Sequence, residues 1–331
     1  SSPVNKSKIK CSKTRYSKRD LNRVINIFDY PVFMVFLKCI QIGGIMNSRL
    51  IAEAGCNHKG DLSIAKEMIE IAANHIKADV IKFQKRNNKE LLTEEQYNSP
   101  HPNPENSYGD TYGAHREFLE FDIHQHQELK DYCEKLGITY STSVWDLTSA
   151  REIASLNPKL IKIPSAINTH FEMLEWLANN YHGEIHLSLG MSTREEEKAI
   201  VDLFVRNNRN KDLILYSCTS GYPVPFEDIA LLEITRLQET YGSVVKEIAF
   251  SGHHLGIAVD VAAFTLGAHT IERHYTLNRT WKGTDHSASL EPDGLRKLKR
   301  DLEAVSQALT FKQEEILPIE KVQRDKLKYR K

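Results

Sequence analysis

The stretch that decides the fold is Val80-Ile81-Lys82-Phe83-Gln84, an apolar run interrupted by two polar side chains. Successive side chains of a β-strand point to opposite faces, so Lys82 and Gln84 lie on the same side of the strand. A short run that is otherwise apolar is typical of a parallel strand covered on both faces. We therefore expect a buried parallel strand here, with a lysine and an amide on one of its faces.

Seven further short runs of mostly apolar residues follow the same plan, and longer amphipathic stretches separate them. The runs lie at residues 50–54, 139–142, 160–164, 185–189, 213–218, 248–251 and 270–274. The amphipathic stretches lie at residues 64–76, 124–136, 148–156, 171–179, 194–206, 226–241, 259–266 and 292–309. Eight strands in strict alternation with eight helices predict an α/β protein, a (β/α)8 or TIM barrel, and argue against an open sheet.

The composition of the 331-residue chain is that of a globular protein, with 40% hydrophobic and 27% charged residues. Its formal net charge of +0 gives no electrostatic reason to expect a nucleic acid or a membrane surface as partner. The five cysteines include no CxxC pair, so a disulfide framework and a thiolate zinc site are both disfavoured. These features favour a reducing, cytoplasmic compartment.

The chain divides into three expected segments. Residues 1–45 form a basic extension outside the catalytic domain, and its apolar run at residues 30–37 is too short to span a bilayer. Residues 46–310 hold the barrel, and residues 311–331 form a charged tail. Within the barrel, residues 87–116 make an unusually long, proline-containing connection, which we expect to fold over the mouth of the active site.

The carboxyl ends of the strands build the active site in a barrel of this kind, and two of these ends carry lysines. An unpaired ammonium group inside a barrel is costly unless it meets an anion. Lys82 and Lys162, on separate strands, therefore indicate a ligand with more than one negative charge, such as phosphoenolpyruvate. The alternative is that each lysine pairs with a nearby carboxylate such as Glu53.

Two histidines end the last two predicted strands and indicate a metal site. His253 and His274 stand on neighbouring strands about 4.8 Å apart, so both imidazoles could share one ion at about 2.1 Å per bond. Two nitrogens with water or substrate oxygens suit a borderline divalent cation such as manganese. Asp285, in the loop after the last strand, would supply an oxygen or orient a hydroxyl. The alternative for each histidine is a hydrogen-bonded structural role.

Eight short motifs at these strand ends resemble the sialic acid (N-acetylneuraminate) synthase family, in one consistent order from about residue 48 to residue 308. They are Ile-Ala-Glu-Ala-Gly-Cys-Asn-His (51–58), Val-Ile-Lys-Phe-Gln (80–84), Tyr-Ser-Thr-Ser (140–143), Lys-Ile-Pro-Ser (162–165), Leu-Ser-Leu-Gly-Met (187–191), Cys-Thr-Ser-Gly-Tyr-Pro (218–223), Ser-Gly-His-His (251–254) and Glu-Arg-His-Tyr-Thr (272–276). The resemblance implies a homodimeric, manganese-dependent synthase. Such an enzyme joins phosphoenolpyruvate and water to an open-chain sugar aldehyde, N-acetylmannosamine or a related sugar, and gives a 2-keto-3-deoxy sugar acid and phosphate.

The resemblance also implies a role for each matching residue. The two metal ligands are His253 and His274. The contacts to phosphoenolpyruvate are Lys82, Thr142, Lys162, Ser165, Ser188, Ser220 and Ser251. The groups near the reacting carbons and the sugar are Glu53, Gln84, Tyr222 and Asp285. Of all these, the predicted catalytic residues are Glu53, Lys82, Lys162 and Asp285.

Three positions depart from the family's pattern. Gly252 replaces an aspartate before the first metal histidine, Ile167 replaces an acidic residue that often contacts the sugar, and Ser217 replaces a common histidine. The first two leave the identity of the sugar open, and the third bears on the phosphate pocket. After Ala308 we expect a charged tail in place of the small antifreeze-like domain that many relatives carry.

Two other functions are compatible with the same residues. One is a Schiff-base sugar-acid aldolase with Lys162 as the nucleophile, which would need no metal. The other is a barrel that binds a sugar or phosphoenolpyruvate without turnover. Borohydride trapping and resistance to chelators would distinguish the first, and binding without phosphate release would distinguish the second.

Overall fold

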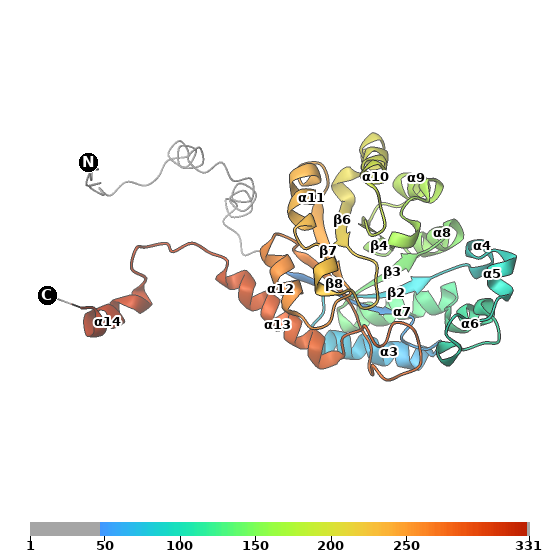
Figure 1. Cartoon of the computed structure of the whole chain (residues 1–331), viewed down its shortest axis with the longest axis horizontal. Helices are drawn as coiled ribbons and strands as arrows, with labels where there is room; N and C mark the ends of the chain where they lie inside the picture. Colours follow the sequence, from blue (N-terminus) through green and yellow to red (C-terminus); the bar gives the residue numbers. More distant parts are fainter. Residues whose placement is uncertain (1–46, 330–331) are drawn as a thin grey trace, which may run out of the picture. The chain divides into compact units, whose positions relative to one another are not determined.

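Eight parallel strands close into a barrel in the computed structural model of the chain, which describes residues 47–329 (Figure 1). Each strand pairs with the next, and β8 pairs with β1 to complete the ring. The predicted barrel is confirmed, while the predicted extension at residues 1–45 lies outside the described residues. The strands are β1 (Arg49–Gly55), β2 (Val80–Lys85), β3 (Thr139–Val144), β4 (Leu160–Ile163), β5 (Glu184–Ser188), β6 (Leu213–Cys218), β7 (Glu247–Gly252) and β8 (Thr270–His274).

Helices surround the strands, and local sequence signals fix their ends (Figure 1). Thr193 caps α10 because its hydroxyl accepts the Glu196 N–H while the Glu196 side chain accepts the Thr193 N–H. Gly137 ends α7 with a φ of 74°, which glycine adopts without strain. The main barrel helices are α3 (Leu62–Ile71), α7 (Ile123–Leu136), α8 (Leu147–Ser155), α9 (Phe171–Asn180), α10 (Arg194–Arg206), α11 (Glu233–Tyr241), α12 (Ala258–Thr265) and α13 (Pro292–Ala308).

One predicted helix is wrong in its extent. The stretch at residues 226–241 is not one helix, because a short 3-10 turn (Phe226–Asp228) precedes α11. Ala230 lies between them with a φ of 51°, which a right-handed helix cannot contain. The connection after β2 holds the short helices α4 (Asn88–Leu91), α5 (Glu94–Asn98) and α6 (Tyr112–Leu119).

The tail after the barrel also holds a helix, α14 (Pro318–Leu327), all of whose residues are at least partly exposed. Within residues 47–329, no helix combines the length and the apolar character needed to cross a membrane.

The inside of the barrel changes from apolar to polar along the strands. A buried apolar cluster inside the barrel consists of Ile51, Val80, Leu160, Ile214, Tyr216 and Ala249, and all of these except Tyr216 form one level. Inward-facing residues alternate along a strand, so the next inward level toward the carboxyl ends lies two residues further on. That level carries Glu53, Lys82, Lys162 and Ser251, all buried. The apolar layer closes the barrel beneath these polar side chains, which therefore face the carboxyl ends of the strands.

Candidate active site

A cavity of about 380 Å³ lies at the carboxyl ends of the strands. Every predicted site residue except Thr142 lines it. Those residues are Glu53, Lys82, Gln84, Lys162, Ser165, Ser188, Ser220, Tyr222, Ser251, His253, His274 and Asp285.

Lys162 is held by a carboxylate that the sequence reasoning did not single out. Its Nζ lies 3.0 Å from both carboxylate oxygens of Glu272, and it stands 3.7 Å above the ring of Tyr216. Burial lowers the pKa of Lys162, and Glu272 opposes this effect. Burial alone would raise the pKa of Glu272, but Lys162 and Lys82 lower it below its usual range. Glu272 therefore stays ionised and aims the Lys162 ammonium group.

Lys82 is the second ammonium group of the cavity, and it also meets carboxylates. Its Nζ lies 2.5 Å from Glu53 Oε2 and 3.7 Å from Glu272 Oε2, and it donates to Ser143 Oγ at 2.7 Å. Coulombic attraction from Glu272 and Glu53 outweighs burial and raises the pKa of Lys82. The alternative that each lysine pairs with a carboxylate is therefore observed, but both pairs lie in the cavity wall and leave two cations facing a ligand.

Thr142, a predicted contact to phosphoenolpyruvate, does not line the cavity. Thr142 Oγ1 lies 2.7 Å from the hydroxyl of Tyr140, which in turn contacts His126 of α7 at 2.8 Å. Side chains alternate along β3, so Thr142 points out of the barrel toward α7 while Ser143 points inward. Ser143 takes its place in the cavity lining.

The hydroxyls of Ser165 and Ser220, which follow β4 and β6, lie against Gly190, which follows β5. A Cβ atom on Gly190 would lie 2.5 Å from Ser220 Oγ and 2.6 Å from Ser165 Oγ, so only glycine allows this approach. Ser251 Oγ donates to Glu272 Oε1 at 3.1 Å and joins the serines to the lysine–carboxylate cluster. Hydroxyl donors beside two ammonium groups form a site suited to an anion.

The two predicted metal ligands lie side by side, with ring centroids 5.3 Å apart. His253 Nδ1 donates to the carbonyl oxygen of Thr219 at 3.1 Å, so its Nε2 keeps the lone pair. Burial, and then the neighbouring His274, lower the pKa of His253 to about 3. The Nδ1 atom of His274 is buried and has no hydrogen-bond partner among the described residues.

These two imidazoles fit a metal ion that takes its other ligands from water or substrate. Neutral imidazole is the metal-binding form, and both rings line the cavity. Within residues 47–329, no set of three or more His, Cys, Asp or Glu side chains is arranged to hold a metal. The protein itself would therefore contribute two nitrogen ligands.

Asp285 and Tyr222 complete the wall around these histidines. Burial would raise the pKa of Asp285, but His274 and Arg116 lower it, so the carboxylate is ionised. A side chain at Gly55, whose φ is 55°, would meet Gln84, Glu53 and Asp285 at 3.0, 3.3 and 3.7 Å, so these three groups converge there. The Tyr222 ring lies 4.5 Å from His253 and 5.8 Å from His274, centroid to centroid.

Comparison with known proteins identifies the family. The family model described as "NeuB family" matches residues 68–314. The human N-acetylneuraminate-9-phosphate synthase is 38% identical over 291 residues, which cover 86% of this chain and 78% of that protein. The chain belongs to the NeuB family. The N,N'-diacetyllegionaminic acid synthase of Campylobacter jejuni is 33% identical over 261 residues, which cover 78% of this chain and 77% of that protein.

A solved structure supports the same placement. The crystal structure of N-acetylneuraminic acid synthetase from Leptospira borgpetersenii, in complex with citrate, matches with a TM-score of 0.72 and 29% identity. The match covers 87% of this chain and 94% of that one. The predictions of a sialic acid synthase-like family and of an enzyme are therefore confirmed.

The long connection after β2 reaches the cavity of this NeuB-family chain. Arg116 of α6 lines the cavity, donates to the Tyr112 hydroxyl at 2.7 Å, and has no carboxylate partner among the described residues. The Tyr108 hydroxyl donates to the Lys282 carbonyl oxygen at 2.5 Å. This bond ties the connection to the loop after β8, which carries Asp285.

Several lining residues escaped the sequence reasoning although strand alternation marks them. Glu272 lies two residues before His274, Ser143 lies two after Ser141, and Arg86 lies two after Gln84, so each shares the inward face of its strand. Arg86 pairs with Glu120 at 3.2 Å, and its guanidinium lies 4.2 Å from the ring centroid of Trp145.

The three departures from the family's pattern all lie outside the cavity lining. A Cβ atom on Gly252 would lie 2.8 Å from His254 Cε1 and 2.9 Å from Phe250 Cε1, so a side chain here would meet those rings. Ile167 packs against the hydrophobic core, and Ser217 is buried on the face of β6 opposite Tyr216. The departures therefore alter the surroundings of the site rather than its lining.

Proposed function

We propose that the chain condenses phosphoenolpyruvate with the open-chain aldehyde of an N-acylated amino sugar, N-acetylmannosamine or a related sugar. Carbon 3 of phosphoenolpyruvate attacks the aldehyde carbon, and the aldehyde oxygen takes a proton. Water then adds at carbon 2, and the tetrahedral intermediate collapses with loss of phosphate. The products are a 2-keto-3-deoxy sugar acid and phosphate.

The observation that carries the proposal is the group of two ammonium ions and several hydroxyls at one end of the cavity. Lys82 and Lys162 are buried cations aimed by carboxylates, and serines 165, 188, 220 and 251 line the same space. A ligand with a carboxylate and a phosphate uses both kinds of donor, and charge-assisted hydrogen bonds to such groups are strong. These contacts hold phosphoenolpyruvate with carbon 3 directed at the aldehyde.

His253 and His274 would hold the divalent cation, which we propose to be manganese. When bound, it acts as a Lewis acid on the sugar aldehyde. Glu53 supports the reaction from the other side, because its carboxylate stabilises the cationic character that develops at carbon 2. Asp285 and Gln84, which converge with Glu53 near Gly55, orient the sugar hydroxyls and the water.

We also propose that the acceptor carries a phosphate group. The human relative is a 9-phosphate synthase, and Arg116 offers a guanidinium cation at the cavity that forms no ion pair with a carboxylate among residues 47–329. A guanidinium group is well suited to a phosphate. The cysteine pattern and the family resemblance support a cytoplasmic homodimer as the working form.

Phosphate release tests the proposal directly. The full chain is supplied with phosphoenolpyruvate, manganese, and either N-acetylmannosamine or its 6-phosphate. Release that requires both the sugar and the metal supports the synthase, and a preference for the phosphorylated sugar supports the role of Arg116. Carbon–carbon bond formation or cleavage that continues in the presence of a chelator, together with a covalent adduct on Lys162 after borohydride reduction, would instead establish the aldolase. Phosphoenolpyruvate binding with no release for either sugar would establish a binding protein.

A further inference from the structure

The turn between β5 and α10 holds a strained residue at the edge of the cavity. The Ser192 N–H donates to the Leu189 carbonyl oxygen at 3.3 Å, which makes Gly190 and Met191 the central residues of a turn. Met191 has a φ of 59°, a conformation that this turn position normally assigns to glycine or asparagine. A side chain persists in such a conformation only where its surroundings enforce it. Met191 also lines the cavity.

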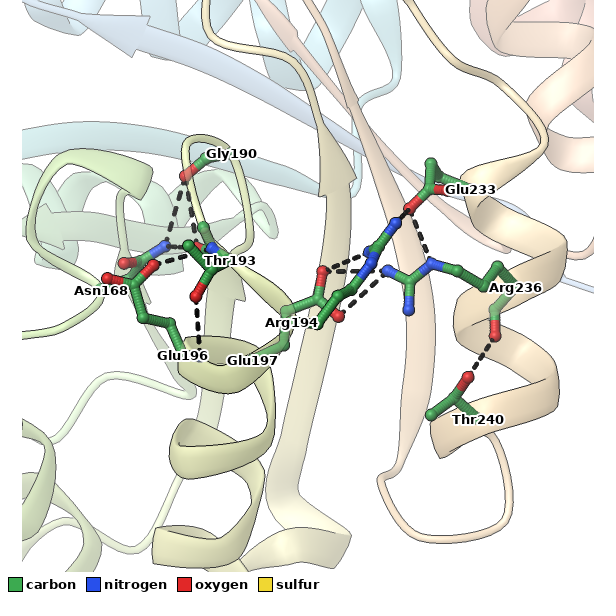
Figure 2. A network of polar contacts seen from close by, with 10 residues as sticks. Asn168, Gly190, Thr193, Arg194, Glu196, Glu197, Glu233, Arg236 and Thr240 are labelled. Carbon is green, nitrogen blue, oxygen red and sulfur yellow. Dashed lines mark hydrogen bonds and ion pairs between the residues drawn. The ribbon is translucent and has the colours of Figure 1, made fainter.

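Asn168, in the connection after β4, forms side-chain hydrogen bonds to this turn. Its side-chain Nδ2 donates to the Ser188 carbonyl oxygen at 2.9 Å and to Ser192 Oγ at 2.7 Å. The Gly190 carbonyl oxygen lies 3.4 Å from the same nitrogen (Figure 2). These acceptors stand before and after Met191 in the chain. Asn168 is 4% exposed, so water cannot readily replace its amide. The buried amide of Asn168 therefore hydrogen-bonds to the chain on both sides of the strained Met191.

The start of α10 is fixed by a separate network. Arg194 and Arg236 alternate with two carboxylates: Arg194 contacts Glu197 at 2.8 Å and Glu233 at 2.9 Å, and Arg236 contacts them at 2.9 and 2.7 Å (Figure 2). This ring joins the first turn of α10 to the first turn of α11. The strand β5 and the helix α10 are thus held independently at the two ends of the turn. The hydrogen bonds from Asn168 determine the path of the turn between them.

We propose that Asn168 is a positioning residue that holds Met191 in its strained conformation and thereby places Gly190 against Ser165 and Ser220. The Gly190 backbone fits between those hydroxyls with no room for a Cβ atom, so a shift of the turn displaces the anion-binding serines. The inference rests on the proposed function in taking phosphoenolpyruvate as the anion. The hydrogen bonds from Asn168 to the turn, which we call the clamp, do not depend on that ligand and can be tested without it.

The experiment measures the dissociation constant of phosphoenolpyruvate, without sugar, for the wild-type chain, N168S, M191G and the double variant N168S/M191G. N168S is expected to weaken binding about tenfold, because Met191 relaxes out of its disfavoured conformation. Glycine adopts that conformation freely, so the same Asn168 change should weaken binding less than about threefold in the M191G background. N168D keeps the side-chain volume but turns acceptors toward the carbonyl groups, and should reproduce the N168S result.

Asn207 provides the matched control at the other end of α10. Its side chain donates to the Leu203 carbonyl oxygen at 2.9 Å and to Glu175 Oε1 at 3.0 Å, so N207S removes comparable bonds far from the turn and should leave binding unchanged. An unchanged dissociation constant in N168S, or an equal loss in both backgrounds, overturns the proposal. If the wild-type chain binds no phosphoenolpyruvate, the proposed function fails. Amide exchange at residues 189–192 then decides: faster exchange in N168S supports the clamp, and unchanged exchange overturns it.

Discussion

The two halves of the cavity are built in different ways. In the serine half, Ser165 just after β4, Ser188 at the end of β5 and Ser220 just after β6 line the cavity. The hydroxyls of Ser165 and Ser220 lie against Gly190 in a tight turn. In the connection half, β8, β1 and β2 carry charged side chains such as Glu272 and Glu53, and long connections after β2 and β8 border the space. Neutral hydroxyl donors beside the Lys162 ammonium group suit a small anion of fixed shape. Long connections, which tolerate sequence change, suit a larger and more variable acceptor.

The largest expected effect separates binding from turnover in the connection half. H274A removes one of two proposed metal ligands and should reduce metal-dependent turnover by at least about a thousandfold. Phosphoenolpyruvate binding without sugar should change little, because we propose that the metal held by His274 acts on the sugar aldehyde. Stopped turnover after chelation of the wild-type enzyme, restored by manganese, is the companion measurement. Full activity of H274A in metal-depleted buffer would remove the metal from the proposal.

A smaller effect is expected where the two halves meet, at Lys162. K162M should weaken phosphoenolpyruvate binding about a hundredfold, because it removes a cation and leaves Glu272 as a buried carboxylate facing an anion. The double variant K162M/E272Q removes that repulsion and should recover part of the affinity, as calorimetry would measure. If the double variant binds no better than K162M, Glu272 does not act through Lys162.

The strands could be predicted from the sequence because each is a short apolar run with turn residues at its ends, and β2 at Val80–Lys85 shows this clearly. The carboxyl ends of the strands and the family motifs then pointed to most of the residues that line the cavity. Thr142 does not line it, because side chains alternate along β3 and Ser143 shares the inward parity of Ser141. Glu272 has the same parity as His274, and this signal was available in the sequence.

Other features of the site had no signal in the sequence. Asn168 contacts the turn after the next strand, so its role depends on a contact between separate connections. The course of the connection after β2 depends on the bond between Tyr108 and Lys282, which are 174 residues apart. Such contacts follow from closure of the barrel, which no local pattern specifies.

Gly190 tests how rigid the serine half is. G190A should raise the KM for phosphoenolpyruvate about tenfold, because the added Cβ atom would push the Ser165 and Ser220 hydroxyls out of place. The KM for the sugar should stay within about twofold, since we propose that the sugar binds in the connection half. G221A is the matched control, because a Cβ atom there would meet only Val224 Cγ2, at 3.1 Å, among close contacts. Equal changes in both KM values would show that the halves are not independent.

The smallest expected effect is a dependence on pH of the stability of α6, in the connection half. His115 of α6 is buried, and its Nδ1 accepts the Tyr108 N–H at 3.1 Å. Burial, and then His101, lower the pKa of His115 to about 4, below the usual value near 6.5. We call α6 closed when His115 is buried as in this structure, and open when His115 is exposed to water. Between these two pKa values, His115 binds a proton in the open form but stays neutral in the closed form. Stability of the closed form is therefore complete above about pH 6.5 and is lost as the pH falls toward 4.

Amide hydrogen exchange measures this opening locally. After correction for the intrinsic pH dependence of exchange, opening of α6 should increase about threefold between pH 7 and pH 6. The turn at residues 189–192 should show no such increase over this range, because it contains no histidine. H115N replaces the acceptor with one that does not titrate, so its α6 exchange should lose the pH dependence. Equal loosening of both halves, or an unchanged slope in H115N, would assign the acid response to the barrel as a whole.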